Sequence, residues 1–126
     1  MTRFCRGPVP SLRVRDTAAT IAFYRDLLGF RVTGRHPVEA PTWIELTHGP
    51  VTLQFFSDPP IGIAEPEMAG TLYLHPDDVT ALAARLEGLV PFEWGPEVMS
   101  YGMREFAVRD PDGYRIAFIE PAGPGT

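Results

Sequence analysis

The residue types that hold metals or act as nucleophiles are few in this chain and lie far apart in its sequence. Its three histidines, His36, His48 and His75, occupy different segments and show neither HxH nor HxxxH spacing, which would bring two imidazoles onto one strand or helix face. Cys5, the single cysteine, has no histidine near it in the sequence and no predicted helix start to lower its pKa. Ser11 stands outside any GxSxG motif. These residues predict neither a three-histidine metal site nor an activated nucleophile.

The composition indicates one folded domain and excludes several classes of protein. The 126 residues are 44% hydrophobic and 21% charged, as in ordinary soluble domains. The formal net charge of −5 and the scattered arginines argue against nucleic-acid binding. No apolar run reaches the roughly 18 residues of a membrane helix, and residues 1–10 lack the apolar core of a secretory signal. A single cysteine forms no intramolecular disulfide, which favours a cytoplasmic location.

Hydrophobic patterning predicts a strand, a helix and three more strands in the first half of the chain. Residues 9–15 alternate between apolar and polar types, as in a half-buried strand. Asp16 is a predicted N-cap for a helix over residues 17–28, which Gly29 is placed to end. The apolar positions of this helix share one face: Ile21, Tyr24 and Leu28. Strands are predicted at 30–35, 42–47 and 51–57, with a turn at 48–50.

The same plan begins again after a connector rich in proline and glycine at residues 58–70. A strand at 71–75 precedes Asp78, a second predicted N-cap, which lies 62 residues after Asp16. The helix that follows has a similar apolar face and a glycine at its end: Val79, Leu82, Leu86 and Gly88. Strands are predicted at about 91–94, 103–109 and 114–120, the last two joined by a turn at 110–113.

This repeat predicts an α+β fold in a single domain of residues 1–126. Two tandem βαβββ modules, at about 8–57 and 71–120, form a curved mixed sheet, because neither module buries its apolar face alone. Helices cover the convex side of the sheet and leave a concave cleft, which is the usual place for a ligand.

Strand alternation predicts the side chains that line this cleft. A tight turn at 48–50 places Trp43 and Glu45 inside it, and a turn at 110–113 that pairs Arg109 with Tyr114 would place Phe106 there as well. Aromatic faces stack on planar ligands, and an acidic group beside Trp or Tyr attracts cations. The predicted ligand-binding residues are Trp43, Glu45, Gln54, Phe56, Thr71, Tyr73, Trp94, Tyr101, Arg104 and Phe106.

Two long segments carry a family resemblance. PVPSLRVRDTAATIAFYRDLLGF and YGMREFAVRDPDGYRIAFIEP resemble the glyoxalase/bleomycin-resistance/dioxygenase superfamily, also called the vicinal oxygen chelate fold, over about residues 9–120. They look most like the bleomycin-resistance branch, although Met103 is inserted between Gly102 and Arg104 of the Gly-x-Arg-Glu-Phe-Ala motif. This resemblance implies a homodimer whose N-terminal strand is exchanged between subunits.

The resemblance also implies four metal-ligand positions, which metal-dependent members usually fill with His, Glu or Gln, His and Glu. Carried over by motif, these positions are Val9, Gln54, Thr71 and Ala117. Valine and alanine offer no donor atom and threonine is a poor one, so Gln54 alone does not make a site for a divalent metal. We therefore expect no metal and no cofactor.

Three kinds of function fit these observations. The first is a metal-free protein that confers drug resistance by sequestering bleomycin, or another planar aromatic peptide or polyketide antibiotic. The second is an enzyme of the same superfamily, a lyase, dioxygenase or isomerase, with Glu45, Glu105 and His75 as its acid–base groups. The third is a partner-binding dimer without a ligand. A tightly bound metal or a chemically altered ligand would favour the enzyme. A cleft closed by Trp and Phe side chains would favour the partner-binding dimer.

Overall fold

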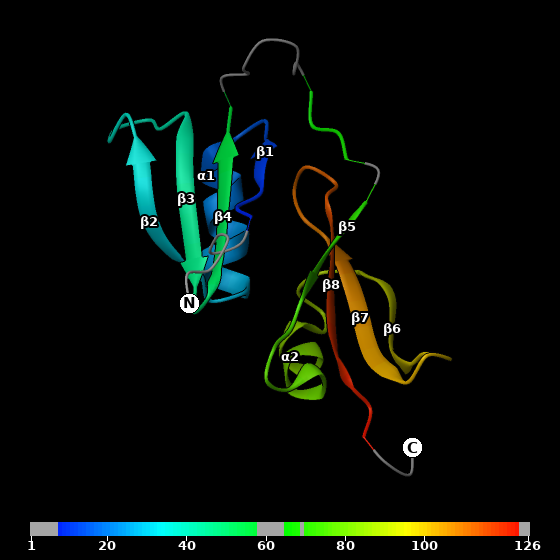
Figure 1. Cartoon of the computed structure of the whole chain (residues 1–126). Coiled ribbons are helices and arrows are strands. Elements are labelled where there is room, and N and C mark those ends of the chain that lie inside the picture. The colour runs from blue at the N-terminus through cyan, green and yellow to red at the C-terminus, as the bar shows by residue number, and fades with distance from the viewer. Residues whose placement is uncertain (1–7, 58–64, 69, 124–126) are drawn as a thin grey trace, which may run out of the picture. The chain divides into compact units, whose positions relative to one another are not determined.

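The structure is a computed structural model that describes residues 8–57, 65–68 and 70–123 (Figure 1). The chain forms two compact units, Met1–Pro66 and Glu67–Thr126, so the division falls in the predicted connector. Cys5, most of that connector and the end of the C-terminal tail lie outside the described residues.

The first unit is one mixed sheet with one helical segment. Its strands run in the order β1-β4-β3-β2, with β1 parallel to β4 and the other pairs antiparallel. The elements are β1 (Ser11–Arg13), α1 (Thr17–Ile21), η1 (Ala22–Leu27), β2 (Arg31–His36), β3 (Trp43–His48) and β4 (Val51–Phe56). The Asp16 side chain accepts hydrogen bonds from the Ala18 and Ala19 N–H groups, and Gly29 has a φ of 81°. The predicted N-cap and helix end are therefore confirmed.

The predicted helix at residues 17–28 differs from the observed one in its second half. The α-helix ends at Ile21 and continues as the π-helix η1, after which the Phe30 N–H donates to the Tyr24 carbonyl at 3.0 Å. The predicted apolar residues Ile21, Tyr24 and Leu28 are all buried, and the wider turns add Phe23 to them. Phe23 and Tyr24 are consecutive and both buried, with their rings edge to face at 5.1 Å.

The second unit repeats the same topology. Its strands run in the order β5-β8-β7-β6, and the edge strand β5 is again parallel to its neighbour, β8. The elements are β5 (Thr71–Leu74), α2 (Val79–Leu86), β6 (Phe92–Val98), β7 (Met103–Arg109) and β8 (Arg115–Pro121). The Asp78 side chain caps α2 by accepting from the Ala81 N–H at 2.9 Å. These two mixed sheets, each with its helix, confirm the predicted α+β fold of two modules.

In each unit the helix packs on one face of the sheet. Tyr24 of η1 lies 5.1 Å from Phe55 of β4, above the buried side chains of Ile44, Leu46 and Leu53. In the second unit three rings from neighbouring strands contact in a row. They are Phe92, Phe106 and Phe118, on the face that carries α2.

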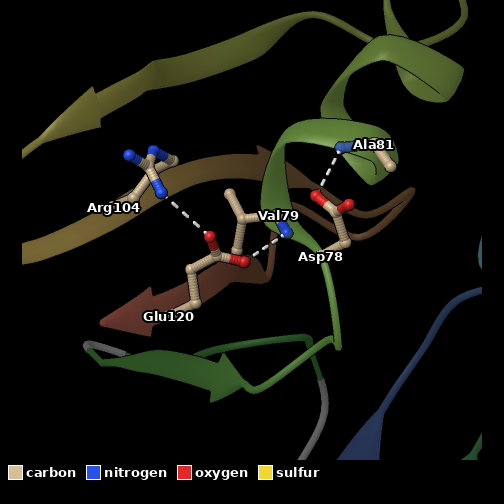
Figure 2. A network of polar contacts seen from close by, with 5 residues as sticks. All are labelled: Asp78, Val79, Ala81, Arg104 and Glu120. Carbon is tan, nitrogen blue, oxygen red and sulfur yellow. Dashed lines mark hydrogen bonds and ion pairs between the residues drawn. The ribbon is translucent and has the colours of Figure 1, made fainter. Parts of the chain in front are cut away.

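Glu120 joins this face of the second sheet to the start of α2. Its Oε1 accepts the Val79 N–H at 2.6 Å, and its Oε2 pairs with Arg104 Nη1 at 3.0 Å (Figure 2). Arg104 lies opposite Glu120 in the sheet register. One carboxylate thus fixes β7 and β8 against an N–H group that the first turn of α2 leaves without a helical acceptor.

The predicted pairing of β7 with β8 is wrong by one residue. Arg109 pairs with Arg115 rather than Tyr114, so Phe106 lies opposite Phe118 and not Ala117. The cause is a three-residue loop, in which Asp110 Oδ1 accepts the Asp112 and Tyr114 N–H groups and Gly113 has a φ of 85°. A slip of one residue moves every side chain of a strand to the other face. Arg104 and Phe106 consequently face the helix rather than the predicted cleft.

Candidate functional site

Each sheet has one face turned away from the helix of its own unit, which we call its open face. On the first sheet the register of β1, β3 and β4 places eight side chains there: Ser11, Arg13, Trp43, Glu45, Thr47, Thr52, Gln54 and Phe56. On the second sheet the open face carries Thr71, Tyr73, Trp94, Glu105, Ala107, Arg115, Ala117 and Ile119. The two open faces hold nearly all the polar and aromatic groups predicted to bind a ligand.

Glu45 is the centre of a hydrogen-bond network on the first open face. Its Oε1 accepts from the Thr33 hydroxyl at 2.9 Å, and its Oε2 accepts from the Gln54 amide at 3.1 Å. Thr33 also lies 2.9 Å from the Thr47 hydroxyl. Both carboxylate oxygens are engaged within the sheet, so the network holds Gln54 in one orientation and leaves its amide oxygen for other partners.

Trp43 pairs with His36 of β2, and its ring extends over Gly34, the β2 residue that faces Glu45. A Cβ added to Gly34 would stand 2.9 Å from the Trp43 ring and 3.3 Å from Glu45 Cβ. The missing side chain therefore lets the indole lie close to β2. Trp43 pairs across the sheet with Phe56, which gives this open face two neighbouring aromatic rings.

On the second open face a tryptophan and an arginine lie above two small residues. The Arg115 guanidinium carbon is 5.6 Å from the centre of the Trp94 ring, a cation–π distance. Trp94 lies opposite Ala107, which pairs with Ala117, and Tyr73 lies beyond it on β5. The two alanines are fully buried, and an aromatic residue stands on each side of them.

Glu105 is a buried carboxylate on the same face. Its side chain is 1% exposed, and its Oε1 accepts from the Tyr101 hydroxyl at 2.5 Å. The hydrogen bond to Glu105 raises the pKa of Tyr101 to about 12, since ionisation would remove the donor and place two negative charges together. Tyr101 thus remains a proton donor to Glu105 near neutral pH.

The structure brings together most of the predicted site residues within each unit. Trp43, Glu45, Gln54 and Phe56 share the first open face, although Phe56 is only 9% exposed. Thr71, Tyr73 and Trp94 share the second, and Tyr101 reaches it through Glu105. Arg104 and the fully buried Phe106 do not belong to this group, for the reason given above.

The predicted ligand-binding residues do not include Glu105, which the sequence predicts only as an acid–base group of the alternative enzyme. The signal that would have revealed its position is Asp110, because an aspartate at the start of a Pro-Asp-Gly loop accepts backbone N–H groups and favours a three-residue connection. That connection reverses the alternation along β7 and turns Glu105 to the open face.

Three of the four positions that correspond to metal ligands lie on the open faces, and the fourth precedes β1. Gln54 lies on the first open face and Ala117 on the second, where Ala117 pairs with Tyr73 rather than with Thr71. Val9 precedes β1 and is 47% exposed. Within residues 8–57, 65–68 and 70–123, no three His, Cys, Asp or Glu side chains gather closely enough to hold a metal ion. The donor set at these positions does not fit a divalent metal.

One hollow lies apart from the open faces. Its volume is about 410 Å³, and it is lined by residues 87–92, between the end of α2 and the start of β6. None of the helices in the described part of the chain has the length and hydrophobicity needed to cross a membrane.

The sequence and fold place this chain in a known superfamily. Residues 8–118 match the Glyoxalase/Bleomycin resistance protein/Dioxygenase superfamily, and the chain belongs to it. No curated protein sequence matches the chain.

Solved structures with this fold include binding proteins and an enzyme. The chain is 27% identical to TnmS3, an antibiotic binding protein from Streptomyces sp. CB03234, covering 90% of this chain and 93% of that one, with a TM-score of 0.73. It is 25% identical to a bleomycin-binding protein complexed with bleomycin, with coverage of 90% and 97% and a TM-score of 0.68. It shares the fold of lactoylglutathione lyase from Agrobacterium tumefaciens at 24% identity, with coverage of 94% and 95% and a TM-score of 0.70.

Proposed function

We propose that this protein binds a planar aromatic antibiotic, of the bleomycin type or another aromatic peptide or polyketide, and sequesters it unchanged. The observation that carries the proposal is the chemistry of the two open faces. They present aromatic rings and hydrogen-bonding groups, whereas the positions where metal-dependent relatives need ligands hold Val9, Gln54, Thr71 and Ala117.

The ligand-binding residues of this proposal are those that lie on, or reach, the open faces. Trp43 and Trp94 supply planar surfaces, and each stacked ring contributes about 0.5–1.5 kcal/mol beyond burial. Tyr73 and Tyr101 are 50% and 61% exposed, so their rings are available to a ligand. Gln54 supplies a fixed amide, and Thr71 a hydroxyl group. Similarity to TnmS3 and to a bleomycin-binding protein supports this class of ligand.

The proposal includes a homodimer with an exchanged N-terminal strand and a cytoplasmic location. β1 is a three-residue edge strand that pairs only with β4 in the described chain, so an equivalent strand from a partner can replace it at little cost in contacts. A Pro10→Ala variant tests the lead-in to this strand, because proline restricts the preceding chain to an extended form. An exchanged dimer that is unchanged in this variant counts against Pro10 as the hinge.

Native mass spectrometry of the purified protein with a panel of aromatic antibiotics, including metal-free and copper-loaded bleomycin, tests the function. The expected result is a metal-free dimer that takes up two drug molecules and releases them with unaltered mass. A Trp43→Leu variant should bind about three- to tenfold more weakly, the loss of one stacked ring. Leu89→Ala is the matched control, because Leu89 is 61% exposed and lies outside both sheets.

The alternative is an enzyme of the same superfamily, because a lyase has the same fold. Its acid–base groups would come from Glu45, Glu105 and His75. A drug that returns with altered mass, or turnover abolished by a chelator, would establish this alternative and overturn sequestration.

A further inference from the structure

In the described part of the chain, the buried polar side-chain atoms that lack a hydrogen-bond partner lie on one face of one sheet. Among the residues that the structure describes, three such atoms occur: Trp94 Nε1, Glu105 Oε2 and Arg115 Nε. All three residues belong to the open face of the second sheet. Native proteins leave few buried polar groups unpaired, so a cluster on one face indicates missing partners supplied by another molecule.

Two of the three atoms are hydrogen-bond donors and one is an acceptor, so they need two different kinds of partner. Trp94 Nε1 and Arg115 Nε are donors and need an acceptor such as a carbonyl oxygen. Glu105 Oε2 is a carboxylate oxygen and accepts, so its best partner is a charged donor. Two arginines near this face have other partners: Arg104 pairs with Glu120 on the helix face, and Arg109 pairs with Glu93 at 2.7 Å. Glu97 lies opposite Glu105 in the register, but a carboxylate is an acceptor and offers Glu105 no hydrogen bond.

We propose that this face is a subsite for a planar aromatic ketone or amide that carries a protonated amine. Its carbonyl oxygen accepts from Trp94 and Arg115, its rings lie against Trp94 and Tyr73, and its ammonium group donates to Glu105. This inference rests on the proposed function and narrows it, because it assigns a charge and a hydrogen-bond pattern to the ligand.

Access to Glu105 requires side-chain movement, and the Tyr101 side chain is the one seen to contact the carboxylate. The carboxylate is buried, and Tyr101, which donates to it, lies in the turn between β6 and β7 that the Gly102 N–H to Met99 carbonyl bond closes at 2.9 Å. Because Tyr101 is 61% exposed, its side chain can rotate away without uncovering a packed core. The arriving ammonium group then binds the oxygen that has no partner.

Glu45 on the other sheet shows why this feature is specific to Glu105. Both Glu45 oxygens accept hydrogen bonds from within its own unit, from Thr33 and Gln54. The two carboxylates occupy open faces of equivalent sheets, yet only Glu105 has an oxygen left over.

Two probes that differ by one group test the subsite: 2-(aminomethyl)-9-fluorenone and 2-(hydroxymethyl)-9-fluorenone. Both are planar ketones, but only the first is cationic at pH 7. Binding is measured by quenching of tryptophan fluorescence in the full chain and in the variants Glu105→Gln and Glu87→Gln. Glu87 is an exposed residue at the end of α2 and gives the same change in net charge away from both open faces.

The wild-type protein should bind the amine at least tenfold more tightly than the alcohol. This preference should fall below threefold in Glu105→Gln and remain in Glu87→Gln. Equal binding of the two probes, a preference that survives in Glu105→Gln, or binding of neither probe at millimolar concentration would each overturn the subsite. If Glu105→Gln fails to fold, the carboxyl ¹³C signal of Glu105 in the wild-type protein decides, since it should shift with the amine and not with the alcohol.

These outcomes are separate from those of the proposed function. A protein that retains an antibiotic from the panel but shows no preference for the amine keeps its sequestering function and loses this subsite. A protein that binds the amine probe through Glu105 but retains no antibiotic keeps the subsite and loses the proposed function.

Discussion

Asp110 determines which side of β7 faces the site, and its replacement by alanine should be costly. Asp110 Oδ1 accepts the Asp112 N–H at 2.9 Å and the Tyr114 N–H at 3.0 Å, and the residue is 5% exposed. Hydrogen bonds to charged groups contribute about 1.5–3 kcal/mol each, although two on one oxygen are not additive. We therefore expect Asp110→Ala to lower the free energy of unfolding by about 3 kcal/mol. The isosteric Asp110→Asn keeps the accepting oxygen and should cost about 1 kcal/mol.

Urea unfolding measures this difference. The chain has two tryptophans, one on each sheet, so a Trp43→Phe background leaves Trp94 as the reporter of the second unit. With a denaturant slope of about 2 kcal/mol/M, the midpoint should fall by about 1.5 M in Asp110→Ala and by about 0.5 M in Asp110→Asn. Equal midpoints for the two variants would refute the argument, because they would show that the accepting oxygen does not hold the loop.

Three further predictions concern the helix cap, a tyrosine and a glycine. Asp78→Ala removes the cap of α2 and should lower the free energy of unfolding by about 1 kcal/mol, whereas Asp78→Ser should stay within about 0.5 kcal/mol of wild type in the same urea assay. The pKa of Tyr101 is raised to about 12, so its hydrogen bond stabilises the fold below pH 10 and is lost as the pH rises through 12; absorbance at 295 nm should show a late ionisation that Tyr101→Phe lacks. Gly34→Ala places a methyl group 2.9 Å from the Trp43 ring and should shift the emission of this tryptophan and weaken drug binding at least about threefold; unchanged emission and affinity would show that the ring does not depend on the glycine.

Much of the fold can be predicted from local sequence signals, namely helix caps, glycines at helix ends and a short turn. Asp16 and Asp78 are followed by helical patterns and act as caps, and Gly29 and Gly88 end the helical segments with positive φ values. A two-residue connection between His48 and Val51 was enough to place Trp43, Glu45 and Gln54 on one face. These features depend on a few neighbouring residues, so their outcome is visible in the sequence.

Family membership was also accessible from the sequence, since the segments around Asp16 and Asp110 carry the resemblance. The absence of usable donors at Val9, Thr71 and Ala117 is likewise a property of residue types alone. The tertiary structure adds that Ala117 lies beside Ala107 and beneath a face bounded by Trp94 and Tyr73.

The orientation of β7 was decided by tertiary structure. The strand sequence is compatible with two pairings of β7 with β8. One pairing places Phe106 on the open face, and the other places Glu105 there. The choice depends on the loop, where Asp110 binds two backbone N–H groups and shortens the connection by one residue. That hydrogen bonding buries Phe106 against the helix and brings Glu105, Trp94 and Arg115 to one surface, because successive side chains of a strand point to opposite faces.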